Sequence, residues 1–261
     1  MEVVIRPTAA EGSCLAADLV ESVVATTPRA VLGLATGSSP VGLYDELGHR
    51  VATGRVSFAG CRAFLLDEYV GLPTGHPQRY RSVIDEIFVR QVGMSSDSVD
   101  GPNGNASDLA EACVEYERRI TEAGGVDIQL LGLGSDGHVA FNEPSSSLAS
   151  RTRLKTLTRR TREDNARFFG GDVAAVPRHC LTQGLGTILE ARRIVLIAAG
   201  VSKAPAVRAM VEGPVSALVP ASVLQLHPRV TVILDEPAAS LLQLADYYRE
   251  VWENKPAWQR P

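Results

Sequence analysis

Residues 30–44 read AVLGLATGSSPVGLY, which places a strand, a tight loop and a helix start next to one another. The run from Ala30 to Ala35 holds only apolar residues and glycine, as expected for a strand that is covered on both faces. Pro40 suits a first helical residue, because the N–H that proline lacks has no partner there. Strand, loop and helix in this order are the repeating unit of a parallel α/β sheet.

The same alternation of short β-rich runs and longer segments of 3.6-residue periodicity extends along the chain. The predicted strands are Val3–Ile5, Ala30–Ala35, Arg62–Leu66, Asp127–Leu131, Leu154–Thr158, Arg193–Ala199 and Val230–Leu234. The predicted helices are Leu15–Val24, one that starts at Pro40, Gln78–Gln91, Ala106–Ala123, Ser202–Glu212 and Ala239–Asn254. No Pro/Gly/Ser-rich linker or repeat interrupts this order. We therefore predict an α/β fold with a mostly parallel central sheet, as a single domain over residues 1–261.

Composition excludes several classes of protein. The 261 residues are 45% hydrophobic and 21% charged, unlike disordered chains, and a net charge of −4 argues against a general nucleic-acid binder. The longest strictly apolar run, Ile194–Ala199, is too short to cross a membrane, and the chain starts without a basic and then apolar leader. Four cysteines without CxxC spacing predict reduced thiols in a core. We expect a cytoplasmic protein without nucleic-acid or membrane partners.

Two predicted loops that lead from a strand into a helix could hold a phosphate. The first consists of Thr36, Gly37, Ser38 and Ser39. The second runs from Gly200 to Lys203, where the lysine adds a positive charge. Backbone N–H groups at a helix start, hydroxyls and a cation together suit an anion. Ser202 is expected to cap the second helix, and for the first loop the alternative is that Thr36, Ser38 and Ser39 only cap the helix.

Residues 151–167 carry seven basic and two acidic side chains in a chain that is negative overall. A solvated basic face is the commoner meaning of such a run, and a site for something anionic is the alternative. RNA is disfavoured, because no aromatic side chains for base stacking are interleaved with the basic ones.

Two adjacent carboxylates, Asp67 and Glu68, directly follow the predicted strand Arg62–Leu66. Buried carboxylates are costly unless they are solvated, paired or used in chemistry, so this pair is a candidate base or metal site. Neighbouring strand residues point to opposite faces, so the pair is poorly placed to chelate one ion. We expect one of the two to have a structural partner.

The predicted strand Asp127–Leu131 leads into GLGSDGH, residues 132–138, which matches the GxGxxG pattern of dinucleotide sites. The residues that follow this pattern do not fit a dinucleotide site. Pro144 interrupts any helix after it, and the next predicted strand is followed by Arg159 and Arg160 instead of an acidic residue. The glycines more plausibly let a polar loop pass close to a small ligand.

That loop brings Asp136, His138 and Glu143 within eight residues. A histidine flanked by carboxylates suits proton transfer near neutral pH, whereas a merely structural histidine is the alternative. The histidines and cysteines have no zinc-ligand spacing, and no GxSxG motif indicates a serine hydrolase.

Five segments together resemble a known family. They are LGLATGSSPVGLY, FLLDEYVGLP, LGLGSDGHVAFNEPSSSLASRTR, GVSKAPAVRAMVEG and LQLHP. They are similar to the glucosamine-6-phosphate deaminases of the glucosamine/galactosamine-6-phosphate isomerase family. The resemblance implies a three-layer αβα Rossmann-like fold and conversion of glucosamine 6-phosphate and water to fructose 6-phosphate and ammonia. It also implies that neither a cofactor nor a metal is required.

Matched by motif position, Asp67 would be the base that moves a proton from C2 to C1 of the sugar. Asp136, His138 and Glu143 would serve opening of the sugar ring. The resemblance further implies that residues 36–39, Arg167 and Lys203 grip the phosphate. It thereby assigns a role to each candidate group found from the residues alone.

Many members of this family are hexamers activated by N-acetylglucosamine 6-phosphate. Positions of that activator site are matched here by Ser146, Arg153, Lys155 and Thr156. The resemblance therefore implies a homo-oligomer, with a hexamer as the expected form. The segment from Ala238 onward departs from the family pattern, so Tyr247 and Tyr248 have no matched position.

Two rival functions follow from the same residues. A 6-phosphogluconolactonase-like hydrolase would use similar sugar-phosphate loops but needs no base for proton transfer at C2. A non-catalytic sugar-phosphate sensor would not need the whole acid–base set, and all four of its positions are filled here. The deaminase interpretation is therefore preferred.

Overall fold

The computed structural model describes residues 1–259, and its centre is a sheet whose paired strands all run parallel. Within the described residues the strand order is β1-β10-β9-β6-β2-β3-β5. The strands are β1 (Glu2–Arg6), β2 (Val31–Leu34), β3 (Arg62–Leu65), β5 (Val99–Asp100), β6 (Ile128–Leu131), β9 (Ile194–Ala198) and β10 (Val230–Asp235). The predicted parallel sheet is thus confirmed.

Helices cover both faces of this sheet. They are α1 (Ala9–Thr26), α2 (Val41–Ala52), α3 (Tyr80–Ile84), α4 (Arg90–Val92), α5 (Leu109–Glu122), α6 (Arg159–Asn165), α7 (Leu185–Leu189), α8 (Ala204–Val211), α9 (Glu236–Ala239) and α10 (Ala245–Glu253). A π-helical turn, Asp85–Val89, joins α3 to α4. Short 3₁₀ turns lie at Ser96–Ser98, Ala166–Phe169, Val201–Lys203, Pro220–Leu226 and Ala257–Gln259.

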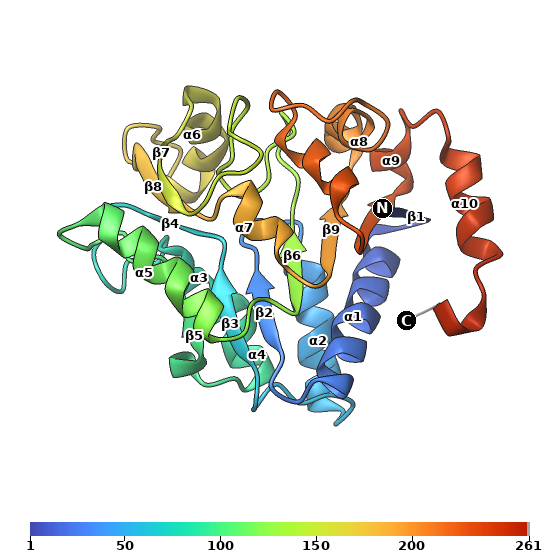
Figure 1. Ribbon diagram of the computed structural model, residues 1–261, viewed down its shortest axis with the longest axis horizontal. Helices are drawn as coiled ribbons and strands as arrows, with labels where there is room; N and C mark the ends of the chain where they lie inside the picture. Colours follow the sequence, from blue (N-terminus) through green and yellow to red (C-terminus); the bar gives the residue numbers. More distant parts are fainter. Residues whose placement is uncertain (260–261) are drawn as a thin grey trace.

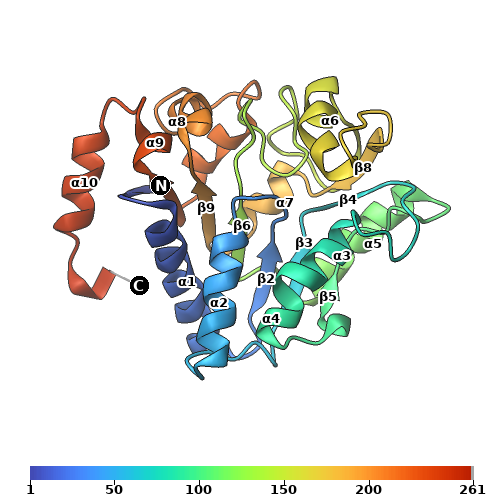
Figure 2. The same cartoon turned by 180° about the vertical axis from the view of Figure 1, so that it is seen from behind.

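Two apolar layers form because alternate strand residues point to opposite faces. Leu32 and Leu34 of β2 pack in one layer with residues of α1 and α2. Val31 of β2 and Phe64 of β3 pack in the other layer with residues of α5, α7 and α8. Figure 1 shows α5 and α7 in front of the sheet, and the reverse view in Figure 2 shows α2 and α4 in front of it. The result is the expected three-layer αβα Rossmann-like arrangement.

A second, smaller sheet is antiparallel and has the order β4-β8-β7. Its strands are β4 (Asp67–Tyr69), β8 (His179–Thr182) and β7 (Arg153–Thr156). It lies with α6 beyond the carboxyl ends of β2, β3 and β6, at the top of Figure 1. Tyr69 of β4 and Cys180 of β8 belong with Phe141 to a third apolar cluster. This sheet therefore stands where a parallel α/β protein binds its ligands.

The small sheet corrects one prediction and adds strands that were missed. The predicted strand Leu154–Thr158 exists as β7 but lies outside the central sheet. Its side chains alternate between half-buried and exposed, as in an antiparallel strand covered on one face. β4, β5 and β8 were not predicted, because β4 and β5 have only three and two residues and the sequence of β8, HCLT, is not an apolar run.

The predicted carboxyl-terminal helix Ala239–Asn254 is wrong as one helix, because α9 and α10 are separate. The side chain of Glu212 accepts hydrogen bonds from the backbone N–H groups of Gln243 (2.8 Å) and Leu244 (2.9 Å), which replaces the helical bonds of these residues. α10 lies against β1, the outermost strand, and Figure 1 shows it at the side of the molecule. No helix in the described part of the chain is long and apolar enough to span a membrane.

The four cysteines are free, as predicted. Cys61, Cys113 and Cys180 are buried, but Cys14 is exposed, so the prediction of core thiols fails for that residue.

Candidate active site

Asp67 lies where the chain leaves the central sheet for the small one. β3 ends at Leu65, and Asp67 opens β4 opposite Thr182 of β8. The residue is 6% exposed, and burial, followed by the charge of Glu68, raises the pKa of Asp67 well above its ordinary value. Within residues 1–259 nothing donates a hydrogen bond to its carboxylate. A buried carboxylate that is unpartnered and more basic than usual is suited to accept a proton.

Glu68 points the other way and is held by the backbone. Its Oε1 accepts from the N–H groups of Tyr69 (2.9 Å) and Tyr80 (3.0 Å), and its Oε2 accepts from the N–H of Arg81 (3.1 Å). Burial raises the pKa of Glu68, although these three bonds and Arg79 act in the opposite direction. The prediction that one of the two carboxylates has a structural partner is confirmed. The bonds also explain why α3 begins at Tyr80 instead of Gln78.

The glycine loop after β6 places His138 against Asp136. His138 Nδ1 lies 2.6 Å from Asp136 Oδ1, and the same oxygen accepts a hydrogen bond of 3.2 Å from the backbone N–H of His138. Burial opposes ionisation of Asp136, but the neighbouring His138 more than offsets it, so the pKa of this carboxyl lies well below its usual range. A Cβ at Gly134 would come within 2.4 Å of the imidazole ring, so only glycine leaves room for it there. No helix follows Gly137 directly, so the prediction that this GxGxxG pattern is not a dinucleotide site is consistent with the loop observed here.

Glu143 completes this cluster. Its Oε2 is buried, has no hydrogen-bond partner in the described structure, and lies 3.9 Å from His138 Nδ1. Its Oε1 accepts a hydrogen bond of 2.5 Å from the hydroxyl of Thr161 in α6. Asp136, His138 and Glu143 each offer one ligand atom within 4.8 Å of the others, so the set could also be read as a metal site.

β8 joins Asp67 to the histidine loop. Thr182 pairs with Asp67 in the sheet, and its hydroxyl accepts a hydrogen bond of 3.1 Å from the N–H of Phe141. Asn142 donates from Nδ2 to the carbonyl of Gln183 at 2.8 Å. Residues at two distant positions of the sequence are thereby fixed on one strand. Sequence reasoning missed this role, because β8 itself was not predicted.

The loop of residues 36–39 follows β2 and is half to fully exposed. Gly37 has a φ of 96°, a left-handed conformation that glycine adopts without strain. The N-cap of α2 is Pro40, and no side chain caps this helix. The alternative that Thr36, Ser38 and Ser39 serve as caps is therefore wrong, and their hydroxyls are available to a ligand.

Lys203 ties the second anion loop to the histidine loop. Its Nζ donates a hydrogen bond of 2.7 Å to the carbonyl of Leu133, and burial lowers the pKa of this lysine. The charges of Asp164, Arg167 and Asp136 act on it, so these groups are its neighbours. Arg167 is exposed, with its guanidinium 4.7 Å from the ring centre of Phe168. The prediction that Ser202 caps the helix is wrong, because it lies within the 3₁₀ turn Val201–Lys203.

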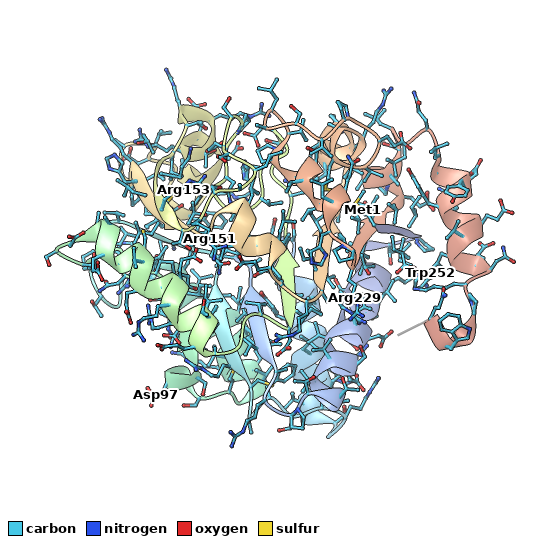
Figure 3. All side chains as sticks on the ribbon, viewed as in Figure 1. Met1, Asp97, Arg151, Arg153, Arg229 and Trp252 are labelled. Carbon is cyan, nitrogen blue, oxygen red and sulfur yellow. The ribbon has the colours of Figure 1, made fainter. Side chains whose placement is uncertain are left out.

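The residues matched to an activator site lie on and before β7. Figure 3 shows Arg153 at the start of this strand, which packs against α5. Arg153 Nη2 and the hydroxyl of Ser146 are buried without a hydrogen-bond partner in the described residues. Lys155 is half-buried and Thr156 exposed.

The sequence analysis did not predict two further sets of hydrogen bonds in the site. Thr158 and Thr161, at the start of α6, both lie within hydrogen-bond distance of Glu143 Oε1. Arg160 donates a hydrogen bond of 3.1 Å to the hydroxyl of Ser135 in the histidine loop. The only sequence signal for this segment was the excess of basic residues after position 151, and it does not indicate which side chains form hydrogen bonds with one another.

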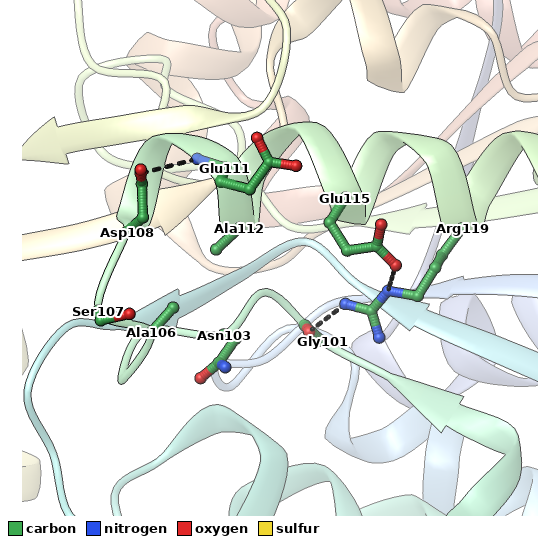
Figure 4. Close-up of a pocket in the computed structure, with 9 residues that line it drawn as sticks. All are labelled: Gly101, Asn103, Ala106, Ser107, Asp108, Glu111, Ala112, Glu115 and Arg119. Atoms are coloured by element: carbon green, nitrogen blue, oxygen red, sulfur yellow. Dashed lines mark hydrogen bonds and ion pairs between the residues drawn. The ribbon is translucent and has the colours of Figure 1, made fainter.

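A separate groove of about 520 Å³ runs beside α5, away from these groups (Figure 4). Two of its charged residues already have structural partners. Asp108 accepts from the N–H groups of Ala110 and Glu111 as the cap of α5, and Arg119 bonds to Asp100 and the carbonyl of Gly101. We therefore place the candidate active site at the small sheet and not in this groove.

The fold and the cluster beyond the strand ends agree with one protein family. The chain belongs to the glucosamine-6-phosphate isomerases/6-phosphogluconolactonases, whose model matches residues 8–233. Within that family it is similar to the glucosamine-6-phosphate deaminases of Mycolicibacterium smegmatis (61% identity) and Beutenbergia cavernae (60% identity), each over 259 residues and 99% of both chains. These alignments extend past Ala238, beyond the last residue that the family model matches.

Among solved structures, the chain is more similar to a deaminase than to a lactonase. A monomeric glucosamine-6-phosphate deaminase has a TM-score of 0.90 at 43% identity and covers 92% of this chain and 100% of its own. The 6-phosphogluconolactonase from Trypanosoma cruzi has a TM-score of 0.72 at 21% identity, covering 93% and 97%. The second likeness establishes the fold alone.

Proposed function

We propose that the protein is a glucosamine-6-phosphate deaminase, which converts glucosamine 6-phosphate and water to fructose 6-phosphate and ammonia. The observation that carries the proposal is Asp67, a buried and unpartnered carboxylate of raised pKa, on the strand pair that also holds the His138 loop. A lactonase would have no use for a base at that position. Similarity over the full length to deaminases supports the same choice.

Ring opening is the first step, and His138 performs it. Because Asp136 faces Nδ1, the Nε2 side of the imidazole is left to exchange a proton with the sugar. It takes the proton of the C1 hydroxyl and returns a proton to the ring oxygen, which breaks the bond from C1 to that oxygen. The ionised Asp136 stabilises the imidazolium that forms in between.

Isomerisation and deamination follow. Asp67 takes the proton from C2 of the open aldehyde and, through a cis-enediolamine, gives a proton to C1. The product is a C2 imine, and addition of water followed by loss of the amine releases ammonia and leaves the C2 ketone. Positioned acid–base groups of this kind contribute about 10² to 10⁴ each in rate.

The phosphate would be held by residues 36–39, Lys203 and Arg167. Lys203→Met is expected to raise KM about 10- to 100-fold with a smaller change in kcat, because a charged hydrogen bond to phosphate contributes about 1.5–3 kcal/mol. Steady-state kinetics measure this. Arg208→Met, which removes a charge from the exposed side of α8, is the matched control and should leave KM unchanged. A KM for Lys203→Met equal to that of the unmodified protein would remove this lysine from the phosphate site.

The decisive experiment is incubation of the purified protein with glucosamine 6-phosphate and measurement of ammonia and fructose 6-phosphate. Equal amounts of both products are expected. If no ammonia forms, even with N-acetylglucosamine 6-phosphate present, the proposal fails. Hydrolysis of 6-phosphogluconolactone would then favour the lactonase, and binding without turnover would favour the sensor.

The reaction is proposed to need no metal. Zinc ligands at bonds of about 2.1 Å in a tetrahedral site lie roughly 3.4 Å apart, whereas His138 Nδ1 and Asp136 Oδ1 are separated by only 2.6 Å. Dialysis against a chelator is expected to leave kcat unchanged, with the metal content measured in parallel. Loss of activity that added Zn²⁺ or Mg²⁺ restores would contradict this.

The proposal extends to regulation, assembly and location. Ser146, Arg153, Lys155 and Thr156 would bind N-acetylglucosamine 6-phosphate in a homo-oligomer, with a hexamer as the expected form, and the unpartnered atoms of Ser146 and Arg153 support an anion there. Light scattering and activation assays decide this, since the 43% identical neighbour is a monomer. A cytoplasmic location and a single domain over residues 1–261 remain predictions.

A further inference from the structure

The two oxygens of the Glu143 carboxylate have different surroundings. Oε1 is approached by the hydroxyls of Thr161 (2.5 Å) and Thr158 (3.3 Å) and by the Thr158 N–H (3.4 Å). Oε2 is buried, has no hydrogen-bond partner in the described chain, and is the oxygen that lies 3.9 Å from His138 Nδ1. One oxygen is therefore anchored and the other is left free beside the histidine.

The direction of the hydrogen bonds follows from counting protons. Each threonine hydroxyl has one proton to donate. Thr161 makes the shortest contact with Oε1 and so donates to it, which leaves its own oxygen to accept from Thr158 Oγ1 at 3.0 Å. Thr158 Oγ1 in turn accepts from the Thr161 N–H at 3.1 Å. The chain of donors ends on Oε1, which can only accept, so a proton that arrives at Glu143 must sit on Oε2.

The backbone of Glu143 is fixed by other elements. Ala140 (φ 50°) and Ser145 (φ 74°) adopt the left-handed conformation that non-glycine residues rarely take, and such strain persists only where the surroundings impose it. The Ser145 N–H donates to the Ala217 carbonyl at 2.7 Å, and the Asn142 side chain donates to the carbonyl of Gln183 at 2.8 Å. The main chain is thus held by Gln183, which follows β8, and by Ala217, whereas the carboxylate is held at the start of α6.

We propose that Thr161, supported by Thr158, is a positioning residue for acid–base catalysis, which holds Oε1 of Glu143 so that Oε2, the oxygen without a hydrogen-bond partner in the described structure, faces His138 and the sugar. The inference rests on the proposed deaminase function. Other titratable groups that face Glu143 in the described structure are Asp136 on its own loop and the buried thiol of Cys180 on β8. Neither donates to Oε1, so the threonines alone set the difference between the two oxygens.

The test is Thr161→Val, which keeps the shape of the side chain and removes the hydroxyl. We expect kcat to fall about 10-fold, KM to stay within about 3-fold, and the acidic limb of the pH–rate profile to move to higher pH by about 0.5–1 unit. The sign follows because a donor to a carboxylate favours its ionised form, so loss of the donor makes protonation easier. Thr161→Ser restores the hydroxyl and should restore both kcat and the profile.

A matched control lies outside the site. Thr187 is also buried, and its hydroxyl donates to Glu117 Oε1 at 2.6 Å. Burial opposes ionisation of Glu117, but hydrogen bonds from Thr152 and Thr187 lower its pKa overall. Thr187→Val removes the same kind of bond from a structural carboxylate, so it should lower thermal stability without moving the pH profile.

The outcomes separate the two proposals. If the unmodified protein forms no ammonia, the deaminase proposal fails. If it is active and Thr161→Val has the unmodified kcat and pH profile, the positioning inference alone is wrong. It is also wrong if Thr161→Ser loses as much activity as Thr161→Val. Should Thr161→Val not fold, Thr158→Val, at an exposed position, carries the test: a smaller change in the same direction supports the inference, and an unchanged profile overturns it.

Discussion

Asp67→Asn is expected to lower kcat about 10³-fold, because the amide is nearly the same size but cannot accept the C2 proton. The rate at which solvent deuterium enters the sugar should fall together with turnover, because both require the base that removes the C2 proton. KM should change little, since the proposed phosphate groups lie on other loops. Mass spectrometry of the product in deuterium oxide, together with steady-state kinetics, measures both effects.

The same variant should not be less stable than the unmodified protein at neutral pH. Burial raises the pKa of Asp67 in the folded state above the unfolded value of about 4. Between the unfolded-state pKa and the higher folded-state pKa, the unfolded chain releases its proton before the folded chain does. The buried carboxyl group therefore lowers the stability of the native state progressively as pH rises. Asparagine cannot ionise and lacks this cost. The melting temperature of Asp67→Asn relative to the unmodified protein should therefore increase from pH 4 to pH 7.

Turnover equal to that of the unmodified protein would remove Asp67 from its catalytic role. A melting temperature that falls relative to the unmodified protein as pH rises would show instead that the carboxylate is stabilised as an anion, which contradicts the unpartnered environment described above.

Glu68→Ala should produce the largest loss of stability, about 3 kcal/mol. Glu68 is 1% exposed, and its removal leaves three backbone N–H groups without an acceptor, at about 1–3 kcal/mol for each that water does not reach. For a chain of this size the change corresponds to a decrease in melting temperature of about 6–12 °C. Activity should fall as well, because the start of α3 and the strand that carries Asp67 lose their common anchor.

Glu68→Gln is the matched variant, since the amide oxygen can still accept from part of the set. It should lose roughly half as much stability as Glu68→Ala. Thermal unfolding followed by circular dichroism gives both values. A melting temperature of Glu68→Ala within about 2 °C of the unmodified protein would mean that these backbone groups find other partners.

The central sheet could be predicted from sequence because its strands are covered on both faces and read as apolar runs. Val31–Leu34 and Ile194–Ala198 illustrate this, since each is buried along its whole length. In a parallel sheet, ligands bind beyond the carboxyl ends of the strands, and this rule alone points to Asp67, His138 and the 36–39 loop.

The small sheet could not be predicted in the same way. β4 and β8 have three and four residues, and the register that pairs Asp67 with Thr182 joins segments more than a hundred positions apart. The partners of Glu143 were missed for a related reason: a threonine at the start of a helix indicates a cap, and Thr158 is one, but nothing local indicates that its neighbour Thr161 bonds to a carboxylate on another loop.

The two edge strands of the central sheet are protected in different ways from pairing with another chain. β5 is only two residues long and offers little open backbone for another chain to pair with, whereas β1 has five residues and is flanked by α10, with Lys255 paired to Glu2. α10 has no fully buried residue, so its own packing contributes little to stability. Its effect is to shield β1 from strand addition, and a chain shortened before Ala245 would gain a tendency to aggregate without losing any proposed catalytic group.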